Sequence, residues 1–276
     1  MCTTVFRELK KRGTRGVAFT TPNLELFKNN NDIDEIIPVR NSNSDQWRQL
    51  GLPFTRLAYA TYDPLRDADE PPNEHILIKM CKLAGIGGPI ELRPYLYLTR
   101  EEFAAGKIAD GQVVMQSSGM SAAFAMRNKE WFPYRFQEVC SELRADVHVI
   151  QLGSPNDPKF EGATDLRGKT TMREAAAIMA NSYVFIGLVG FLMHLARAVD
   201  CRSVIVYGGR EKPVQSGYVT NKNLYSQVKC APCWLRNPCE YDRKCMDMIS
   251  VSQVITAAAE QISRYGTLLE VQTAKI

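Results

Sequence analysis

The chain has 276 residues, of which 45% are hydrophobic and 23% charged, the composition of a globular protein with room for one large or two modest domains. Its net charge of +4 at pH 7 comes without a dense block of Lys and Arg, so nucleic acid is not the favoured partner. An anionic small molecule suits this charge equally well.

The start of the chain and its apolar runs predict neither export nor membrane insertion. The opening residues carry no apolar core and meet a charge at Arg7, unlike a signal peptide. The longest apolar run, from Tyr183 to Ala198, contains two glycines and a histidine and is shorter than the roughly 18 residues of a spanning helix. We therefore expect a cytoplasmic protein without a transmembrane segment, and a peripheral contact with a membrane stays open.

Short apolar runs alternate with helical patterns in the first half of the chain. The order strand, helix, strand, helix is predicted at 16–20, 23–29, 35–39 and 75–84. Residues 50–72 are rich in turn formers, and 100–107 are expected to be part of a connection between two halves.

The second half alternates more regularly between strands and helices. Strands are predicted at 112–116, 147–152, 183–186 and 203–207. Helices are predicted at 134–143, 171–181, 191–199 and 252–262. Thr170 is expected to cap the second of these helices, with Glu174 beside it. This alternation predicts an α/β fold whose parallel sheet is covered by helices on both faces.

Ligands of such sheets bind where strands end and helices begin, which directs attention to the loop after Gln116. There Ser117, Ser118 and a glycine would let a phosphate approach the backbone, and Lys129 would supply a countercharge. The alternative is an ordinary polar loop with a solvated lysine, and spacing alone favours that alternative.

A second glycine turn lies at Gly187–Gly190, directly before a predicted helix that carries His194. Free N–H groups and the helix dipole would favour a diphosphate at this turn. The alternative is that His194 is a core histidine and that the glycines serve only the turn.

Four of the eight cysteines lie within sixteen residues: Cys230, Cys233, Cys239 and Cys245. This spacing lets four thiolates converge on one tetrahedral ion, and both zinc and iron suit such a set. The alternative is a group of buried or redox-active thiols. The scattered cysteines, 2, 81, 140 and 201, are expected to be plain buried thiols.

Several stretches together resemble glycosyltransferase family 9, the heptosyltransferases of bacterial surface glycans. The likeness runs over nearly the whole chain and is carried by NDIDEIIP at 31–38, KEWFP at 129–133, LRGKTTMRE at 166–174 and MHLA at 193–196. The cysteine segment resembles that of a subgroup that includes protein-modifying heptosyltransferases, in which four cysteines hold iron.

The resemblance implies a GT-B fold of two facing Rossmann-like domains. We expect an incomplete acceptor-side domain at 1–105, which lacks its first strand, and a nucleotide-sugar-binding domain at 106–276 with the cysteine loop 230–245 and a terminal helix. The implied donor is a nucleotide-diphospho sugar such as ADP-heptose, and the implied acceptor is a surface glycan, a lipopolysaccharide core or a protein. The implied transfer is inverting and needs no divalent metal, so an iron or zinc ion at the cysteines would be structural.

Carried over to this sequence, the resemblance assigns the diphosphate to Ser117, Ser118 and Lys129. It also implies that the turn at Gly190 and the ring of His194 close the phosphate site.

The same resemblance places Met172 beside the adenine and Asp157 at the ribose. The sequence departs from the family at Val189, where members usually have an aspartate followed by Ser/Thr-Gly. The family also opens with a strand and a Gly-x-Gly-Asp-like loop, whose aspartate is the general base and which would precede Met1. We therefore expect the chain as written to be slow or inactive, and a truncated start is the expected cause.

Two rival functions remain from the sequence. A catalytically silent nucleotide-sugar-binding protein or fragment agrees with Val189 and with the missing base. A metal or redox module in which the cysteines are the function is the third reading, although the predicted sheet is far larger than such a module needs.

Overall fold

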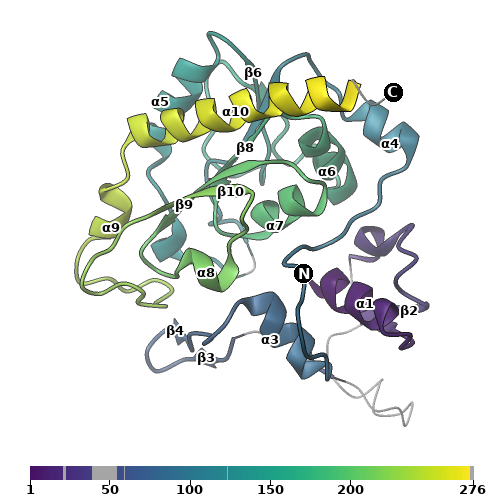
Figure 1. The fold of residues 1–276 in the computed structure, drawn as a ribbon. Helices are drawn as coiled ribbons and strands as arrows, with labels where there is room; N and C mark the ends of the chain where they lie inside the picture. The colour runs from purple at the N-terminus through teal and green to yellow at the C-terminus, as the bar shows by residue number, and fades with distance from the viewer. Residues whose placement is uncertain (21–22, 39–54, 59, 123, 274–276) are drawn as a thin grey trace.

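The computed structural model describes residues 1–20, 23–38, 55–58, 60–122 and 124–273, which form an upper and a lower body in Figure 1. The upper body contains the large sheet and its helices. The lower body contains short helices and short strands, and the N-terminus lies between the two bodies.

The large sheet has six strands, all parallel, in the order β10-β9-β8-β5-β6-β7. The strands are β5 (Gln112–Met115), β6 (His148–Gln151), β7 (Thr164–Asp165), β8 (Phe185–Leu188), β9 (Ser203–Gly208) and β10 (Asn221–Tyr225). The four predicted strands of this half are confirmed, and each of their ends lies within two residues of its predicted position. The short edge strands β7 and β10 have mixed polar sequences with little periodicity, and the sequence did not indicate them.

Successive residues of the central strands point to opposite faces of this sheet, as strand geometry requires. In β5, Val114 faces one hydrophobic core, whereas Val113 and Met115 face the other. All three side chains are completely buried. Burial of a side chain of this size contributes about 2 kcal/mol. A strand buried on both faces therefore reads as a continuous apolar run.

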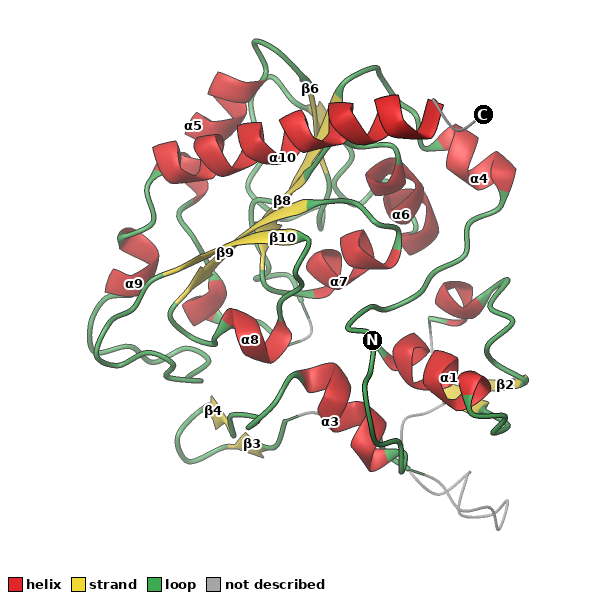
Figure 2. Cartoon of the chain, in the orientation of Figure 1, coloured by secondary structure: helices red, strands yellow, loops and turns green. Residues whose placement is uncertain are grey.

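Helices cover both faces of the sheet, as predicted (Figure 2). One face packs against α5 (Pro133–Leu143) and α10 (Val251–Thr273), and the other against α6 (Met172–Ala180) and α7 (Phe191–Ala198). The last helix is eleven residues longer at its end than the predicted 252–262. The short helices are η2 (Arg127–Lys129), α8 (Pro213–Ser216) and α9 (Lys244–Asp247).

Helix α6 begins one residue later than predicted, and its cap is Thr171 rather than Thr170. The Thr171 hydroxyl accepts from the Glu174 N–H at 3.1 Å, and the Glu174 carboxylate accepts from the Thr171 N–H at 2.7 Å. This reciprocal pair is a capping box, which needs Glu three positions after the cap. The spacing to Glu174 therefore identifies Thr171, whereas Thr170 stands one position too early.

The lower body is built from short elements: α1 (Cys2–Lys11), β1 (Val17–Thr20), η1 (Leu24–Phe27), β2 (Glu35–Pro38), β3 (Tyr62–Asp63), β4 (Ala68–Asp69) and α3 (Ile76–Leu83). Strands β1 and β2 pair in parallel, and β3 and β4 form an antiparallel hairpin. The two predicted strands and the helix at 75–84 are confirmed, and the helix predicted at 23–29 is the short 3₁₀ turn η1. The end of the second strand, at residue 39, and residues 50–54 of the turn-rich segment lie outside the described residues.

The connection between the two bodies is held to α6 by an ion pair and by hydrogen bonds. Helix α4 (Arg100–Ala105) lies in the expected connection and packs against α6. Arg173 of α6 donates to the Glu102 carboxylate at 2.7 Å and to the carbonyl of Tyr97 at 2.6 Å. The Arg173 guanidinium lowers the pKa of Glu102 to about 2, so this carboxylate stays ionised at neutral pH. The division of the chain at residues 105 and 106 stays a prediction.

Candidate active site

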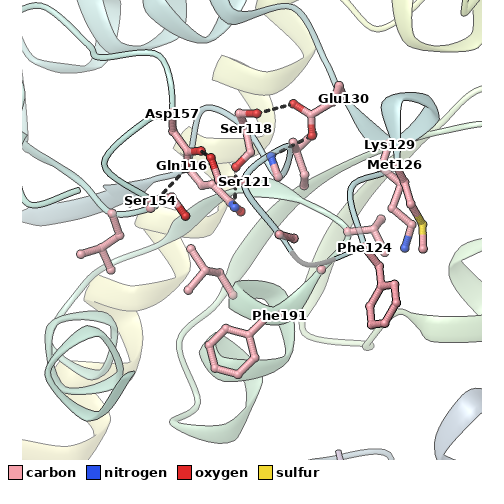
Figure 3. Close-up of a pocket in the computed structure, with 18 of the residues that line it drawn as sticks. Gln116, Ser118, Ser121, Phe124, Met126, Lys129, Glu130, Ser154, Asp157 and Phe191 are labelled. Carbon is pink, nitrogen blue, oxygen red and sulfur yellow. Dashed lines mark hydrogen bonds between the residues drawn. The ribbon is translucent and has the colours of Figure 1, made fainter. Parts of the chain in front are cut away.

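A cavity of about 880 Å³ opens where the central strands of the large sheet end (Figure 3). Its walls come from the loops after β5, β6 and β8 and from the start of α6: Gln116, Ser118, Gly119, Leu152, Gly153, Ser154, Val189, Gly190, Thr171 and Met172. Its size lies within the range of small-molecule sites. The cavity thus has the location that a parallel sheet gives to a ligand.

The hydrogen-bond donors of the loop after β5 contact a carboxylate of the protein itself. Ser118 Oγ donates to Glu130 Oε2, and the Gly119 N–H donates to Glu130 Oε1, both at 2.7 Å. Burial raises the pKa of Glu130, and these two hydrogen bonds offset only part of that rise. Ser118 and Gly119 therefore donate to the oxygens of Glu130, and the predicted binding of a phosphate by this loop stays a prediction. Glu130 was missed, although it follows Lys129 directly in the KEWFP stretch.

Ser117 lies outside the lining of this cavity, so the structure does not bring it together with Ser118. Its side chain is completely buried, and its hydroxyl donates to the carbonyl of Pro158 at 2.6 Å. The same hydroxyl accepts from the Gln151 amide at 3.1 Å. These contacts give Ser117 a role in joining the loop after β5 to the loop after β6.

Asp157 does line the cavity, on the side of the loop after β6. Its carboxylate accepts from Ser121 Oγ and from the Ser154 N–H, each at 2.8 Å. Gly153 has a φ of 143°, and a Cβ added there would lie 2.4 Å from Asp157 Oδ2. Glycine is therefore required at 153 for the carboxylate to reach this position.

Lys129 reaches the cavity from the end of η2. Its Nζ lies 2.7 Å from Oε1 of Glu211, a carboxylate that also contacts Arg210 at 3.2 Å. Burial acts to raise the pKa of Glu211, but Lys129 and Arg210 outweigh it and lower the pKa to about 2. The predicted cation is present, and it is paired with an acid that the sequence did not indicate.

Gly190 and His194 lie at the start of α7, but only Gly190 lines the main cavity. His194 faces an adjoining cavity of about 310 Å³, which Lys129, Gly190 and Glu211 also line. Its Nδ1 lies 2.6 Å from the hydroxyl of Tyr218, and burial lowers the pKa of the imidazole to about 3. The ring is therefore neutral. A neutral ring agrees with both predictions for this histidine, a core residue or a neighbour of the phosphate site.

The four clustered cysteines line a separate cavity of about 440 Å³. The N–H of Arg243 donates to Cys239 Sγ at 3.3 Å. Backbone N–H groups of Leu235 and Gly209 also point at the sulfurs of Cys233 and Cys245. Thiols with backbone N–H groups aimed at sulfur have the chemistry of zinc or iron ligands, but their present arrangement does not form a metal site. Within the described ranges, no group of three or more His, Cys, Asp or Glu side chains is drawn together closely enough to hold a metal ion.

A sequence profile of glycosyltransferase family 9 (heptosyltransferase) matches residues 99–243. The chain therefore belongs to glycosyltransferase family 9, and family membership supports glycosyltransferase activity. No curated protein matches the sequence significantly.

Solved structures share the fold at low sequence identity. A family 9 glycosyltransferase from Veillonella parvula superposes with a TM-score of 0.70 at 15% identity, over 95% of this chain and 92% of that one. The ADP-heptose LPS heptosyltransferase II of E. coli gives 0.68 at 14%, over 95% and 94%. TibC, an iron-containing dodecameric glycosyltransferase from enterotoxigenic E. coli, gives 0.66 at 16%, over 95% and 71%. The predicted α/β fold class of GT-B type is confirmed.

No helix in the described part of the chain has both the length and the apolar character needed to cross a membrane.

Proposed function

We propose that this protein transfers a heptose, or a related sugar, from a nucleotide-diphospho donor such as ADP-heptose. The acceptor is a hydroxyl of a surface glycan, a lipopolysaccharide core or a protein, and the location is cytoplasmic. One observation carries the proposal: a single cavity at the ends of β5, β6 and β8 is lined by Ser118, Lys129, Asp157, Met172 and Gly190. Five of the seven residues assigned to the nucleotide-sugar donor thus line one cavity.

The proposed reaction is an inverting displacement at the anomeric carbon. The acceptor oxygen forms a bond to this carbon and releases its proton through a general base to the solvent, and the bond to the diphosphate oxygen breaks with its electron pair. Charge therefore gathers on the departing diphosphate, where Lys129 and the loop at Ser118 stabilise it. No divalent metal is needed for this step, because protein cations and backbone N–H groups supply the countercharge.

We also propose that the four cysteines hold one structural iron or zinc ion. When bound, the ion would cross-link both ends of the loop 230–245 and fix its path. The chain's own residues already give this loop a defined place, since Asn128 Nδ2 donates to the carbonyls of Leu235 and Pro238 at 3.2 and 2.8 Å.

A second candidate is a catalytically silent protein that binds nucleotide sugars. The contacts of Glu130 with Ser118 and Gly119 favour this candidate, because the carboxylate already accepts the hydrogen bonds that these two residues would donate to a phosphate. Hydrolysis and transfer assays with ADP-heptose separate the two candidates, since the silent protein binds the donor and converts none of it.

Calorimetry with ADP tests the proposed donor site. Lys129→Ala is expected to weaken ADP binding about tenfold, the effect of one charge-assisted contact of about 1.4 kcal/mol. Lys107→Ala serves as the matched control, because Lys107 is exposed and paired with Asp110 at 2.8 Å away from the cavity. Absence of ADP binding by the folded wild-type protein would refute the proposal.

A further inference from the structure

The segment Trp234–Pro238, between Cys233 and Cys239, is a strap that lies between the two bodies. On one side it bonds to the hairpin of the lower body, because the Asp69 N–H donates to the Trp234 carbonyl at 3.0 Å and the Arg236 N–H to the Asp67 carbonyl at 2.8 Å. On the other side the Asn128 N–H donates to the Arg236 carbonyl at 2.9 Å. The strap therefore places Arg236 directly beside the turn that carries Lys129.

The Arg236 side chain lines the 880 Å³ cavity and is 17% exposed. Its Nε and Nη2 both donate to Asp69 Oδ1, at 3.1 and 2.6 Å, and its guanidinium lies 3.8 Å from the centre of the Tyr62 ring. Its Nη1 donates to no residue that the structure describes. The planar group is thus held on one side by Asp69, and among the described residues its Nη1 hydrogens stay available to a ligand.

Arg236 belongs to a chain of five bonded charged groups. Asp69 Oδ2 accepts from Arg210, which contacts Glu211, and Glu211 pairs with Lys129. The side chains of Asp69, Arg210 and Glu211 are between 1% and 7% exposed. This chain of groups holds three cations and two acids, and the carboxylate of Asp67 also faces Arg236. Lys129 and Arg236, the two ends of this chain of groups, both line the cavity, as does the separate cation Arg56.

Cations that a network of ion pairs already holds at a cavity wall can bind an anion with little further ordering of their side chains. A diphosphate at Lys129 is the anion that the proposed function brings to this cavity. We infer that Arg236 is a further cation that binds the diphosphate, supplied by the cysteine loop and positioned by Asp69. This inference rests on the proposed function. It also gives the loop a direct part in the substrate site, beyond stabilising the fold.

The rival explanation is purely structural: Arg236 joins the strap to the hairpin through Asp69 and touches no ligand. The two explanations differ in what they predict for ligands with and without phosphate. A structural clamp affects ADP and adenosine alike, whereas a diphosphate contact affects ADP alone.

Calorimetry with ADP and with adenosine tests the inference on the full chain. Arg236→Gln is expected to weaken ADP binding about tenfold and to leave adenosine binding unchanged. Arg236→Lys keeps the charge but loses the planar fork, so an intermediate loss for ADP is expected. Arg127→Gln is the matched control, because Arg127 is an exposed arginine of the same turn and does not line the cavity.

The outcomes separate the inference from the proposed function. If the wild type binds ADP and Arg236→Gln binds it equally well, or loses ADP and adenosine to the same extent, the assignment of Arg236 is wrong and the donor site stands. If the wild type binds no ADP, both fail. If Arg236→Gln does not fold, Arg236→Lys decides the question. An ADP affinity equal to that of the wild type at raised ionic strength overturns the inference. A loss of affinity for ADP but not for adenosine supports it.

Discussion

The ammonium of Lys129 and the carboxylate of Glu211 form a 2.7 Å ion pair between a cavity wall and the protein interior. Lys129 is 19% exposed, whereas Glu211 is 5% exposed and also accepts from Ser216 at 2.7 Å. The acid is therefore fixed, and the lysine is the partner that can turn to a ligand. A diphosphate that enters the cavity has to share this lysine with Glu211.

Glu211→Gln is expected to destabilise the protein by about 3 kcal/mol at pH 7, because it leaves buried cations without their acid. The folded-state pKa of Glu211 is lowered to about 2 from an ordinary value of 4.5. Its stabilisation is therefore present above pH 4.5 and lost as the pH falls towards 2. Urea titrations should show the gap between wild type and variant closing over this window. Glu138→Gln, an exposed change on α5, is the control, and a gap independent of pH would contradict the assignment.

Gly153→Ala is expected to destabilise the protein by about 2 kcal/mol and to displace Asp157. The added methyl group would lie 2.4 Å from Asp157 Oδ2, on a backbone with a φ of 143°. Gly87→Ala is the matched control, because nothing lies within 4 Å of its added Cβ. Denaturant unfolding measures the stability, and calorimetry with adenosine follows the proposed ribose contact. Equal effects of the two substitutions would refute the steric argument.

Thr171→Ala is expected to lower the free energy of unfolding by about 1 kcal/mol, since it removes a side-chain cap of α6. Thr170→Ala, one residue earlier, is expected to have an effect within about 0.5 kcal/mol, the usual range for a position without such a contact. Chemical denaturation of both variants tests the assignment. A larger loss of stability for Thr170→Ala than for Thr171→Ala would show that Thr170 is the cap, as the sequence analysis predicted.

Purified protein is expected to carry about one zinc or iron ion per chain, bound by the four thiolates. Elemental analysis checks the ratio, and Cys239→Ser is expected to lower it, whereas Cys2→Ser leaves it unchanged. Because Cys233 and Cys239 stand at the two ends of the strap, removal of the ion by a chelator should also weaken ADP binding. Metal-free protein with full ADP affinity would show that the strap holds its place without the ion.

Local signals predicted most of the large sheet and its helices. Apolar residues in continuous runs, such as Val113 to Met115, are buried on both faces, so composition alone marks them as strands. The hairpin β3–β4 gave no such signal, because its two-residue strands are stabilised by contacts with the strap rather than by their own pattern. Propensity cannot reveal an element whose partner lies more than 160 positions away in the sequence.

The sequence by itself determined the parallel α/β layout, the four-cysteine segment and the loop ends at Ser118, Asp157 and Gly190, because strand–turn–helix chemistry is local. Only the tertiary structure decided that Glu130 accepts the hydrogen bonds of the loop at Ser118, that Glu211 pairs with Lys129 and that Asp69 positions Arg236. The physical reason is that ion pairs depend on distances of a few ångströms between side chains from separate segments. Charge type is visible in the sequence, but the partner of each charge is chosen by the fold.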